Sequence, residues 1–204
     1  MRYEAQENAL SLYNLRVGAR YRWVRERVIP PVLDVGCADD PIFEGSPLVY
    51  RCDIDVWDHP NFVQCDAEQL PYKSKSFNTV VISEILEHVN NPEAVVAEAV
   101  RVARKRVLIT TPKESDWDAT AHPHEKVEQS VYAKYGSYEK WVEQEQYGIY
   151  PKLRKKVPDS LIPHSFHVRE WDDDSISKLL NGYTASQEML SSSGFVWYCI
   201  VIQA

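Results

Sequence analysis

Two carboxylates and a glycine directly follow short apolar runs in the first third of the chain. Asp53 and Asp66 each end such a run, and Gly36 follows the first one. A glycine lets a ligand approach the backbone closely, and a carboxylate accepts hydrogen bonds from hydroxyl or amino groups. Together these residue types suit a ligand that carries hydroxyl and amino groups.

Five apolar runs predict strands buried inside a sheet. They lie at residues 32–35, 48–52, 62–65, 77–83 and 106–110. Strands that alternate with helices form parallel units with right-handed crossovers. We therefore expect an α/β fold with a Rossmann-like doubly wound sheet, mostly parallel, with helices on both faces.

Capping residues predict a helix between the last two of these strands. Asn91 is placed to cap it, and Pro92 stands at its first position. Arg101, Arg104 and Lys105 are expected in its last turn, where positive charge opposes the negative end of the helix dipole.

The two ends of the chain predict further elements. Apolar residues three or four apart indicate an amphipathic helix over residues 5–28. Asp172 or Asp173 can cap a helix that runs through Leu180 and ends at Gly182. The last expected elements are an antiparallel pair of strands at 183–190 and 195–202.

Length and composition favour one domain over residues 1–204. Residues 113–170 show neither the strand pattern nor the helix pattern of the rest of the chain. We expect them to form an insertion that serves as a lid or as the acceptor side of a site. The net charge of −7 disfavours a nucleic-acid partner. No apolar run is long enough to span a bilayer and no secretory signal is evident, so a cytoplasmic location is expected.

The four cysteines, Cys37, Cys52, Cys65 and Cys199, are scattered without the spacing of a zinc site. We expect them to be reduced, buried thiols, and we expect no metal.

In open α/β sheets, ligands bind at the carboxyl ends of the strands. There Asp53 can accept both hydroxyls of a ribose, and Asp66 can accept from an adenine amino group. A turn or a helix cap explains any single Asp as well. The agreement of three strand ends favours an adenosine-containing cofactor.

The sequence resembles the class I S-adenosylmethionine-dependent methyltransferases, especially the group of ubiquinone and menaquinone biosynthesis methyltransferases. The stretches 32–37, 66–72 and 77–88 carry the resemblance, which covers about residues 32–112. It implies S-adenosylmethionine as the cofactor. The implied cofactor-binding residues are Asp34, Gly36, Ala38, Asp53, Ile54, Asp66, Ala67 and Ser83.

The resemblance also implies a role for each of these residues. Asp34 and Gly36 would shape the methionine end of the site. Asp53 would hold the ribose, Ile54 would pack on the adenine face, Asp66 and Ala67 would contact the adenine, and Ser83 would line the floor of the pocket.

The loop after Gly36 departs from the family pattern. Ala38 and Asp40 stand where further glycines are usual, and Asp53 follows Asp34 by only 19 residues. We expect a loop in place of the usual helix. Arg16 and Arg20 on the first helix are either partners of the cofactor carboxylate or part of a solvated face.

Methyl transfer is an in-line displacement, so the protein mainly aligns the acceptor and excludes water. A base is needed only if the acceptor loses a proton. The candidate catalytic residues are His88, His122 and His124, with His164 and His167 as further candidate bases.

The expected acceptor is a small molecule, a sugar or a lipid-linked intermediate. A nucleobase amino group is disfavoured, because Ser83-Glu84-Ile85-Leu86 stands where enzymes of that class place an Asp or Asn followed by two prolines. A nicotinamide enzyme is disfavoured because the loop after Gly36 lacks the later glycines of a pyrophosphate site. The alternative is a non-catalytic binding or regulatory module that kept the fold; the oligomeric state is left open.

Overall fold

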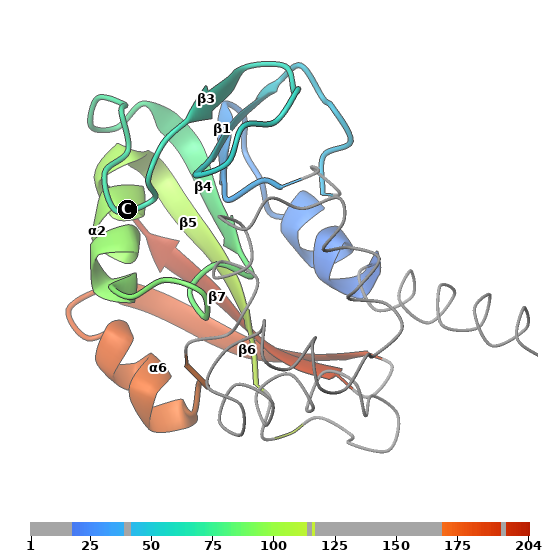
Figure 1. The fold of residues 1–204 in the computed structure, drawn as a ribbon. Coiled ribbons are helices and arrows are strands. Elements are labelled where there is room, and N and C mark those ends of the chain that lie inside the picture. The colour runs from blue at the N-terminus through green and yellow to red at the C-terminus, as the bar shows by residue number, and fades with distance from the viewer. Residues whose placement is uncertain (1–17, 39–41, 114–115, 117–168, 193–194) are drawn as a thin grey trace, which may run out of the picture.

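The computed structural model describes residues 18–38, 42–113, 116, 169–192 and 195–204. Seven strands form one sheet in the order β3-β2-β1-β4-β5-β7-β6 (Figure 1). Their bounds are β1 Val32–Val35, β2 Val49–Asp53, β3 Phe62–Gln64, β4 Phe77–Ser83, β5 Ala103–Pro112, β6 Thr184–Ser192 and β7 Phe195–Gln203.

The sheet has the expected mixture of strand directions. Strands β1 to β5 pair in parallel, β7 runs antiparallel to β5, and β6 runs antiparallel to β7. The predicted Rossmann-like fold with a C-terminal antiparallel pair is therefore confirmed.

Helix α2, Pro92–Val102, begins as its sequence predicts and ends earlier. The Asn91 side chain accepts a hydrogen bond from the Ala94 amide at 3.1 Å, and Pro92 occupies the first turn. At Ala103 the backbone becomes extended and enters β5. The placement of Arg104 and Lys105 in the last helical turn was wrong, because both lie in β5 and only Arg101 remains in that turn.

Helix α6, Asp173–Leu179, is capped by Asp172, whose side chain accepts from the Ser175 amide at 2.7 Å. On the other face of the sheet, residues 18–25 are helical, and the Arg27 amide donates to the Val24 carbonyl in a tight final turn. The helix thus ends before the predicted residue 28. Residues 5–17 of that prediction lie outside the described part of the chain.

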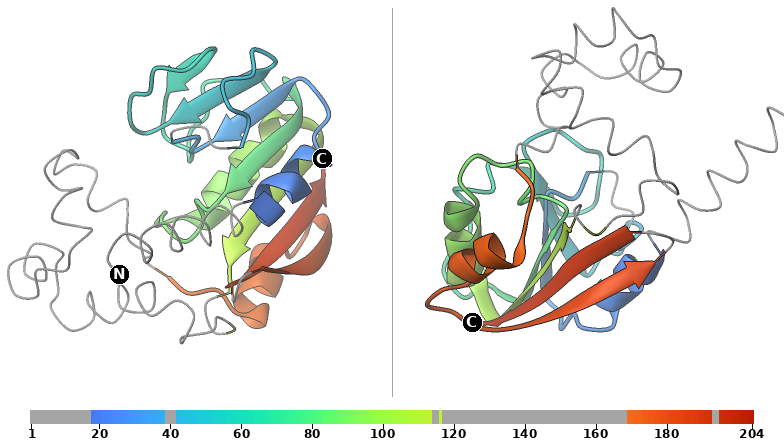
Figure 2. Two further views of the ribbon diagram at one scale, coloured as in Figure 1. Left: turned by 90° about the vertical axis from the view of Figure 1, so that its right-hand side faces the viewer. Right: turned by 90° about the horizontal axis from the view of Figure 1, so that it is seen from below.

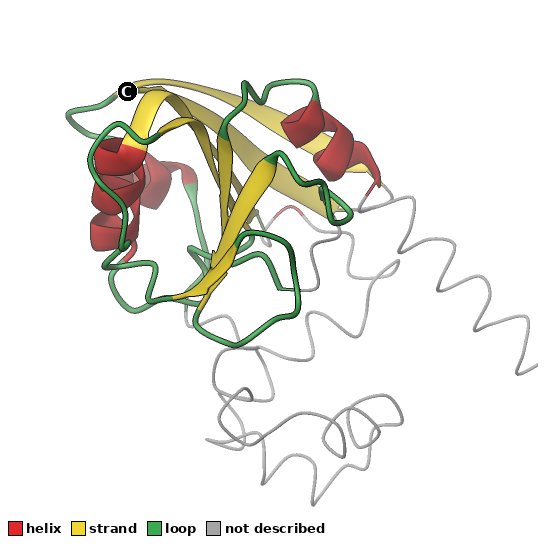
Figure 3. Cartoon of the chain, turned by 90° about the horizontal axis from the view of Figure 1, so that it is seen from above, coloured by secondary structure: helices red, strands yellow, loops and turns green. Residues whose placement is uncertain are grey.

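Helices cover both faces of the sheet (Figure 3). Buried residues of α2 and α6, such as Val96 and Ile176, pack on one face with Leu33 and Val80. On the other face Trp23 and Val24 pack with residues of the sheet that include Val81, Leu108 and Trp197. Every residue of β1 is buried, as expected of a strand covered on both faces.

The antiparallel pair at the end of the chain forms one edge of the sheet. Figure 2 shows that the helix of residues 18–25 and helix α6 lie on opposite sides of β6 and β7. Glu188 of β6 accepts hydrogen bonds from the Trp23 indole and from the Arg27 guanidinium. These contacts attach the first helix to the edge strand.

Residues 42–48, between β1 and β2, form no helix, as the short interval predicted. The buried Arg51 guanidinium donates to the carbonyls of Val49, Pro60 and Ser46 at 2.8, 3.0 and 3.1 Å. Arg25 donates to the Ile42 carbonyl from the first helix. Arginine side chains therefore hold this connection by hydrogen bonds to its backbone.

Candidate functional site

The carboxyl ends of β1 and β2 meet as the sequence predicted. The Gly36 and Cys37 amides donate to the Cys52 carbonyl at 2.8 and 3.2 Å. The Asp53 carboxylate accepts from the Ala38 amide at 2.9 Å with one oxygen and from the Asp55 amide at 3.0 Å with the other. Gly36, Ala38 and Asp53 thus lie together.

Gly36 is fixed by backbone conformation and by packing. Its φ is +68°, and a Cβ at this position would lie 1.9 Å from Cδ1 of Ile85. The glycine therefore lets the turn after β4 pack against the end of β1, a role that the sequence did not reveal.

Ala38 takes a backbone conformation that favours glycine. Its φ is +44°, which costs an alanine about 1 kcal/mol or more. The Asp53 carboxylate holds its amide, and Nε2 of His59 lies 2.7 Å from its carbonyl oxygen. These two contacts stabilise the loop where the family pattern has a glycine.

Asp66 and Ile54 follow the carboxyl ends of β3 and β2 at the same edge of the sheet. Oδ1 of Asp66 accepts from the Glu68 amide at 2.9 Å in a turn that also contains Ala67, whereas Oδ2 accepts no hydrogen bond from the described residues. The Ile54 side chain is 45% exposed, which is high for a large apolar residue beside a buried strand. A polar acceptor and an apolar surface are thus both available.

Helix α2 holds the segment that follows Asp66 and Ala67. Arg101 donates to the carbonyls of Leu70 and Tyr72 at 2.9 and 2.7 Å. Oε2 of Glu98 accepts from the Leu70 amide at 2.9 Å, and Oε1 accepts from Arg101 at 2.6 Å. The Arg101 guanidinium lowers the pKa of Glu98 below its usual value.

Ser83 and Asp34 occupy the centre of the sheet. Oγ of Ser83 lies 2.8 Å from Oγ1 of Thr110, so the end of β4 is tied to β5 by a side-chain hydrogen bond. Asp34 is buried within β1, where it pairs in register with Arg51 and Val81.

Arg20 is buried against the end of β4. Its guanidinium lies 2.5 Å from Oε2 of Glu84, which also accepts from the Trp197 indole at 3.2 Å. Burial is the largest single influence and lowers the pKa of Arg20, but Glu84, Tyr21 and Glu87 together outweigh it and raise this pKa above its usual value. The solvated-face interpretation of Arg20 was wrong, because the side chain is 9% exposed; Arg16 lies outside the described residues.

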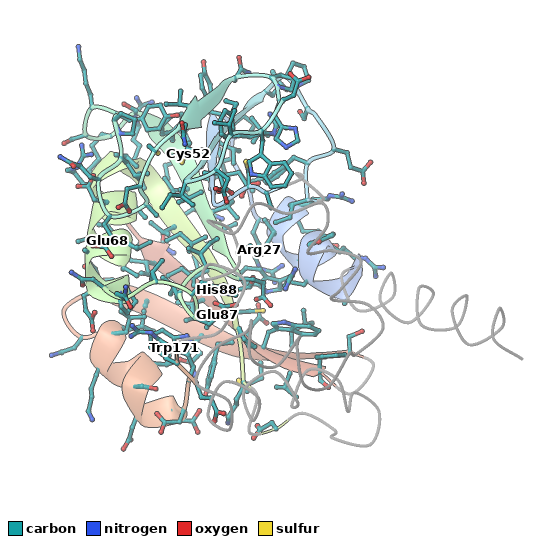
Figure 4. All side chains as sticks on the ribbon, in the orientation of Figure 1. Arg27, Cys52, Glu68, Glu87, His88 and Trp171 are labelled. Atoms are coloured by element: carbon teal, nitrogen blue, oxygen red, sulfur yellow. The ribbon has the colours of Figure 1, made fainter. Side chains whose placement is uncertain are left out.

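Two acids after β4 were not assigned a role from the sequence. Glu84 pairs with Arg20, and the fully buried Glu87 accepts from the Thr111 hydroxyl at 3.0 Å. His88 lies beside Glu87, with Nε2 at 4.0 Å from Oε1, and both are labelled in Figure 4. The available clue was two acids spaced three apart at the carboxyl end of a buried strand.

The remaining histidine candidates lie outside the described residues: His122, His124, His164 and His167. The predicted insertion 113–170 is described only at Lys113, Asp116, Arg169 and Glu170. Within the described ranges, no three His, Cys, Asp or Glu side chains cluster as metal ligands. No helix in the same ranges is long and apolar enough to cross a membrane.

The model of a methyltransferase domain family matches residues 47–110, from just before β2 into β5. No curated protein matches the chain.

Solved structures share the fold. An S-adenosylmethionine-dependent methyltransferase from Archaeoglobus fulgidus is 15% identical, with a TM-score of 0.58, over 97% of this chain and 99% of that one. Magnesium protoporphyrin IX methyltransferase from Synechocystis, with bound S-adenosylhomocysteine, is 15% identical, with a TM-score of 0.52, over 98% of this chain and 87% of that one. A Burkholderia thailandensis 1,6-didemethyltoxoflavin N1-methyltransferase is 12% identical, with a TM-score of 0.54, over 98% of this chain and 82% of that one. The chain has the Rossmann-like methyltransferase fold.

Proposed function

We propose that this chain, which has the class I methyltransferase fold, transfers a methyl group from S-adenosylmethionine to a small-molecule, sugar or lipid-linked acceptor. The observation that carries the proposal is the Asp53 carboxylate at the end of β2, hydrogen-bonded to the loop that follows β1. The match of a methyltransferase domain to residues 47–110 supports it. Membership of the ubiquinone and menaquinone group and a cytoplasmic location remain predictions from the sequence.

The described residues fit an adenosine-containing cofactor. Each carboxylate oxygen accepts about two hydrogen bonds, and each Asp53 oxygen accepts one from the described residues, so each would accept a second from a ribose hydroxyl. The exposed Ile54 side chain would pack on the adenine, and Oδ2 of Asp66 would accept from its amino group. The nearby Ala67 backbone would contact the same ring.

The methionine end of the cofactor would lie over the end of β1. Gly36 and Ala38 would bring the backbone close to it, with Asp34 beneath and Ser83 on the floor of the pocket. Carboxylates at this edge suit a positively charged sulfonium, because opposite charges attract strongly where water is excluded.

When bound, the cofactor supplies a methyl group that is activated by the sulfonium charge. The chain's own residues then have to hold the acceptor in line and keep water out. For an acceptor that must lose a proton, we propose His88 as the base, because the fixed Glu87 carboxylate lies 4.0 Å from its Nε2. His122 and His124 remain sequence-based candidates for the same role.

The test is a calorimetric titration of the full chain with S-adenosylhomocysteine and with S-adenosylmethionine. Replacing Asp53 by Ala should weaken binding by about 1 to 3 kcal/mol, which is about 5- to 150-fold, because the half-buried carboxylate that accepts from the ribose is lost. The matched control is Asp58→Asn, which removes one exposed charge from the same loop and should leave the affinity within about twofold.

Equal losses in Asp53→Ala and Asp58→Asn would contradict the ribose assignment. Failure of the unmodified chain to bind either ligand would favour the alternative of a non-catalytic module that kept the fold.

A further inference from the structure

Two thiols lie side by side at the nucleoside end of the proposed site. Cys52 of β2 pairs in register with Val63 of β3, and Cys65 follows Val63 by two residues, so both cysteine side chains lie on the same face of the sheet. Both pack into the core that α2 covers. Their side chains are hydrogen-bonded to each other. Figure 4 shows Cys52 near β3.

The two thiols differ in access and in charge. Cys52 is buried, whereas Cys65 is half-buried just beyond the end of β3. The hydrogen bond with Cys52 lowers the pKa of Cys65, and the same contact raises the pKa of Cys52. Since the thiolate is the reactive form of cysteine, Cys65 is the thiol that meets an oxidant first.

We propose that Cys65 is an oxidative modification site for peroxides, with Cys52 as the thiol that resolves it. The Cys65 thiolate attacks one peroxide oxygen, the O–O bond breaks, and hydroxide leaves while Cys65 becomes a sulfenic acid. The Cys52 sulfur then attacks the sulfenic sulfur and releases water, with the Cys52 proton in that water. Overall, two thiols and one hydrogen peroxide give one disulfide and two waters.

The consequence of this bridge rests on the proposed function. Asp53 directly follows Cys52, and Asp66 directly follows Cys65, so the two acids assigned to ribose and adenine are neighbours of the two sulfurs. The Cys65 amide also donates to the Asp53 carbonyl at 2.8 Å. A covalent bond between the sulfurs would therefore change the spacing of both acids, and we expect oxidation to weaken nucleoside binding at least tenfold.

The experiment treats the full chain with hydrogen peroxide and maps its disulfides by peptide mass spectrometry. Affinity for S-adenosylhomocysteine is measured before oxidation, after oxidation, and after reduction with dithiothreitol. Cys65→Ser removes the reactive thiol at a half-buried position. Cys199→Ala is the matched control, because Cys199 is a buried thiol in the core on the opposite face of the sheet.

The expected result is a Cys52–Cys65 bridge in the unmodified chain and in Cys199→Ala, with a reversible loss of affinity, and neither effect in Cys65→Ser. The site is overturned if mapping finds Cys52 and Cys65 unbridged after peroxide. The proposed effect of the bridge on nucleoside binding is overturned if the bridge forms while the affinity for S-adenosylhomocysteine stays unchanged. A chain that never binds S-adenosylhomocysteine contradicts the proposed function, and the mapping then still decides the modification site.

Discussion

The two halves of the sheet are stabilised in different ways. Strands β4, β5 and β7 lie between helices, with α2 and α6 on one face and residues 18–25 on the other. Strands β2 and β3 have no helix of their own among the described residues. Several large apolar side chains in and beside these strands are correspondingly exposed: Leu48, Tyr50, Ile54, Val56 and Val63.

Hydrogen bonds to the backbone take the place of those helices. Arg51 donates to three carbonyls around β2, and Arg101 with Glu98 holds the segment after β3. A hydrogen bond to a charged group contributes about 1.5 to 3 kcal/mol, which is similar to burying one large apolar side chain. The comparison teaches that the half with β2, β3 and the loop after β1, here the polar half, is held by a few polar contacts, whereas the half with β4, β5 and β7, the apolar half, is held by a core.

The largest expected effect is that of Gly36→Ala in the polar half. The new Cβ meets Ile85, and alanine disfavours a φ of +68°. The free energy of unfolding should fall by about 2 to 5 kcal/mol in urea denaturation. The control is Gly182→Ala, since Gly182 has a φ of +90° with open space around it and should lose only about 1 to 2 kcal/mol. Equal losses at the two glycines would show that packing against Ile85 adds nothing.

Arg51→Met should have the next largest effect. Methionine keeps much of the volume but removes the guanidinium donor from the carbonyls of Val49, Pro60 and Ser46. We expect a loss of about 2 to 4 kcal/mol in the free energy of unfolding. Hydrogen exchange should become faster in residues 42–61 and stay unchanged in α6. A uniform change across the chain would contradict a local role.

Arg101→Met should cost about 1 to 2 kcal/mol, because its hydrogen bonds are only partly buried. The cost should depend on pH. The pKa of Glu98 in the folded protein lies below its unfolded value of 4.5. The ionised Glu98 carboxylate therefore contributes fully to the free energy of unfolding above pH 4.5, and this contribution is lost as the pH falls through the folded pKa.

The measurement is the free energy of unfolding of the unmodified chain and of Arg101→Met between pH 7 and pH 3. The difference between the two proteins should become smaller as the pH falls. Arg104→Met is the control, since exposed Arg104 donates only to the Lys75 carbonyl among the described residues and should show a small difference without this trend. If the difference in unfolding free energy caused by Arg101→Met stayed constant with pH, the stabilisation by Arg101 would not depend on the ionisation of Glu98.

The buried centre of the sheet was the easier part to predict from the sequence. The bounds of β1 and β4 agree with those predicted, and the Asn91 cap gave the start of α2. These features depend on local patterns of burial and capping. The start of β5 was missed because Arg104 and Lys105 favour a helix end by their charge, whereas pairing with β4 decides the structure.

Around β2 and β3, the positions of Asp53 and Asp66 were predicted from the sequence, but the side chains that support this part of the sheet were not. Asp53 and Asp66 stand at strand ends, which a sequence pattern can identify. The burial of Arg51 and the pairing of Arg20 with Glu84, 64 residues along the chain, depend on tertiary contacts. A charged side chain gives no periodic pattern that would reveal a buried partner.

The most direct test of the account is amide hydrogen exchange of the full chain with and without saturating S-adenosylhomocysteine. The account predicts slower exchange in residues 36–38, 53–57 and 65–69, where the loops after β1, β2 and β3 lie, with no change in α6. Unchanged exchange in these three loops, or slower exchange confined to β6 and β7, would contradict it.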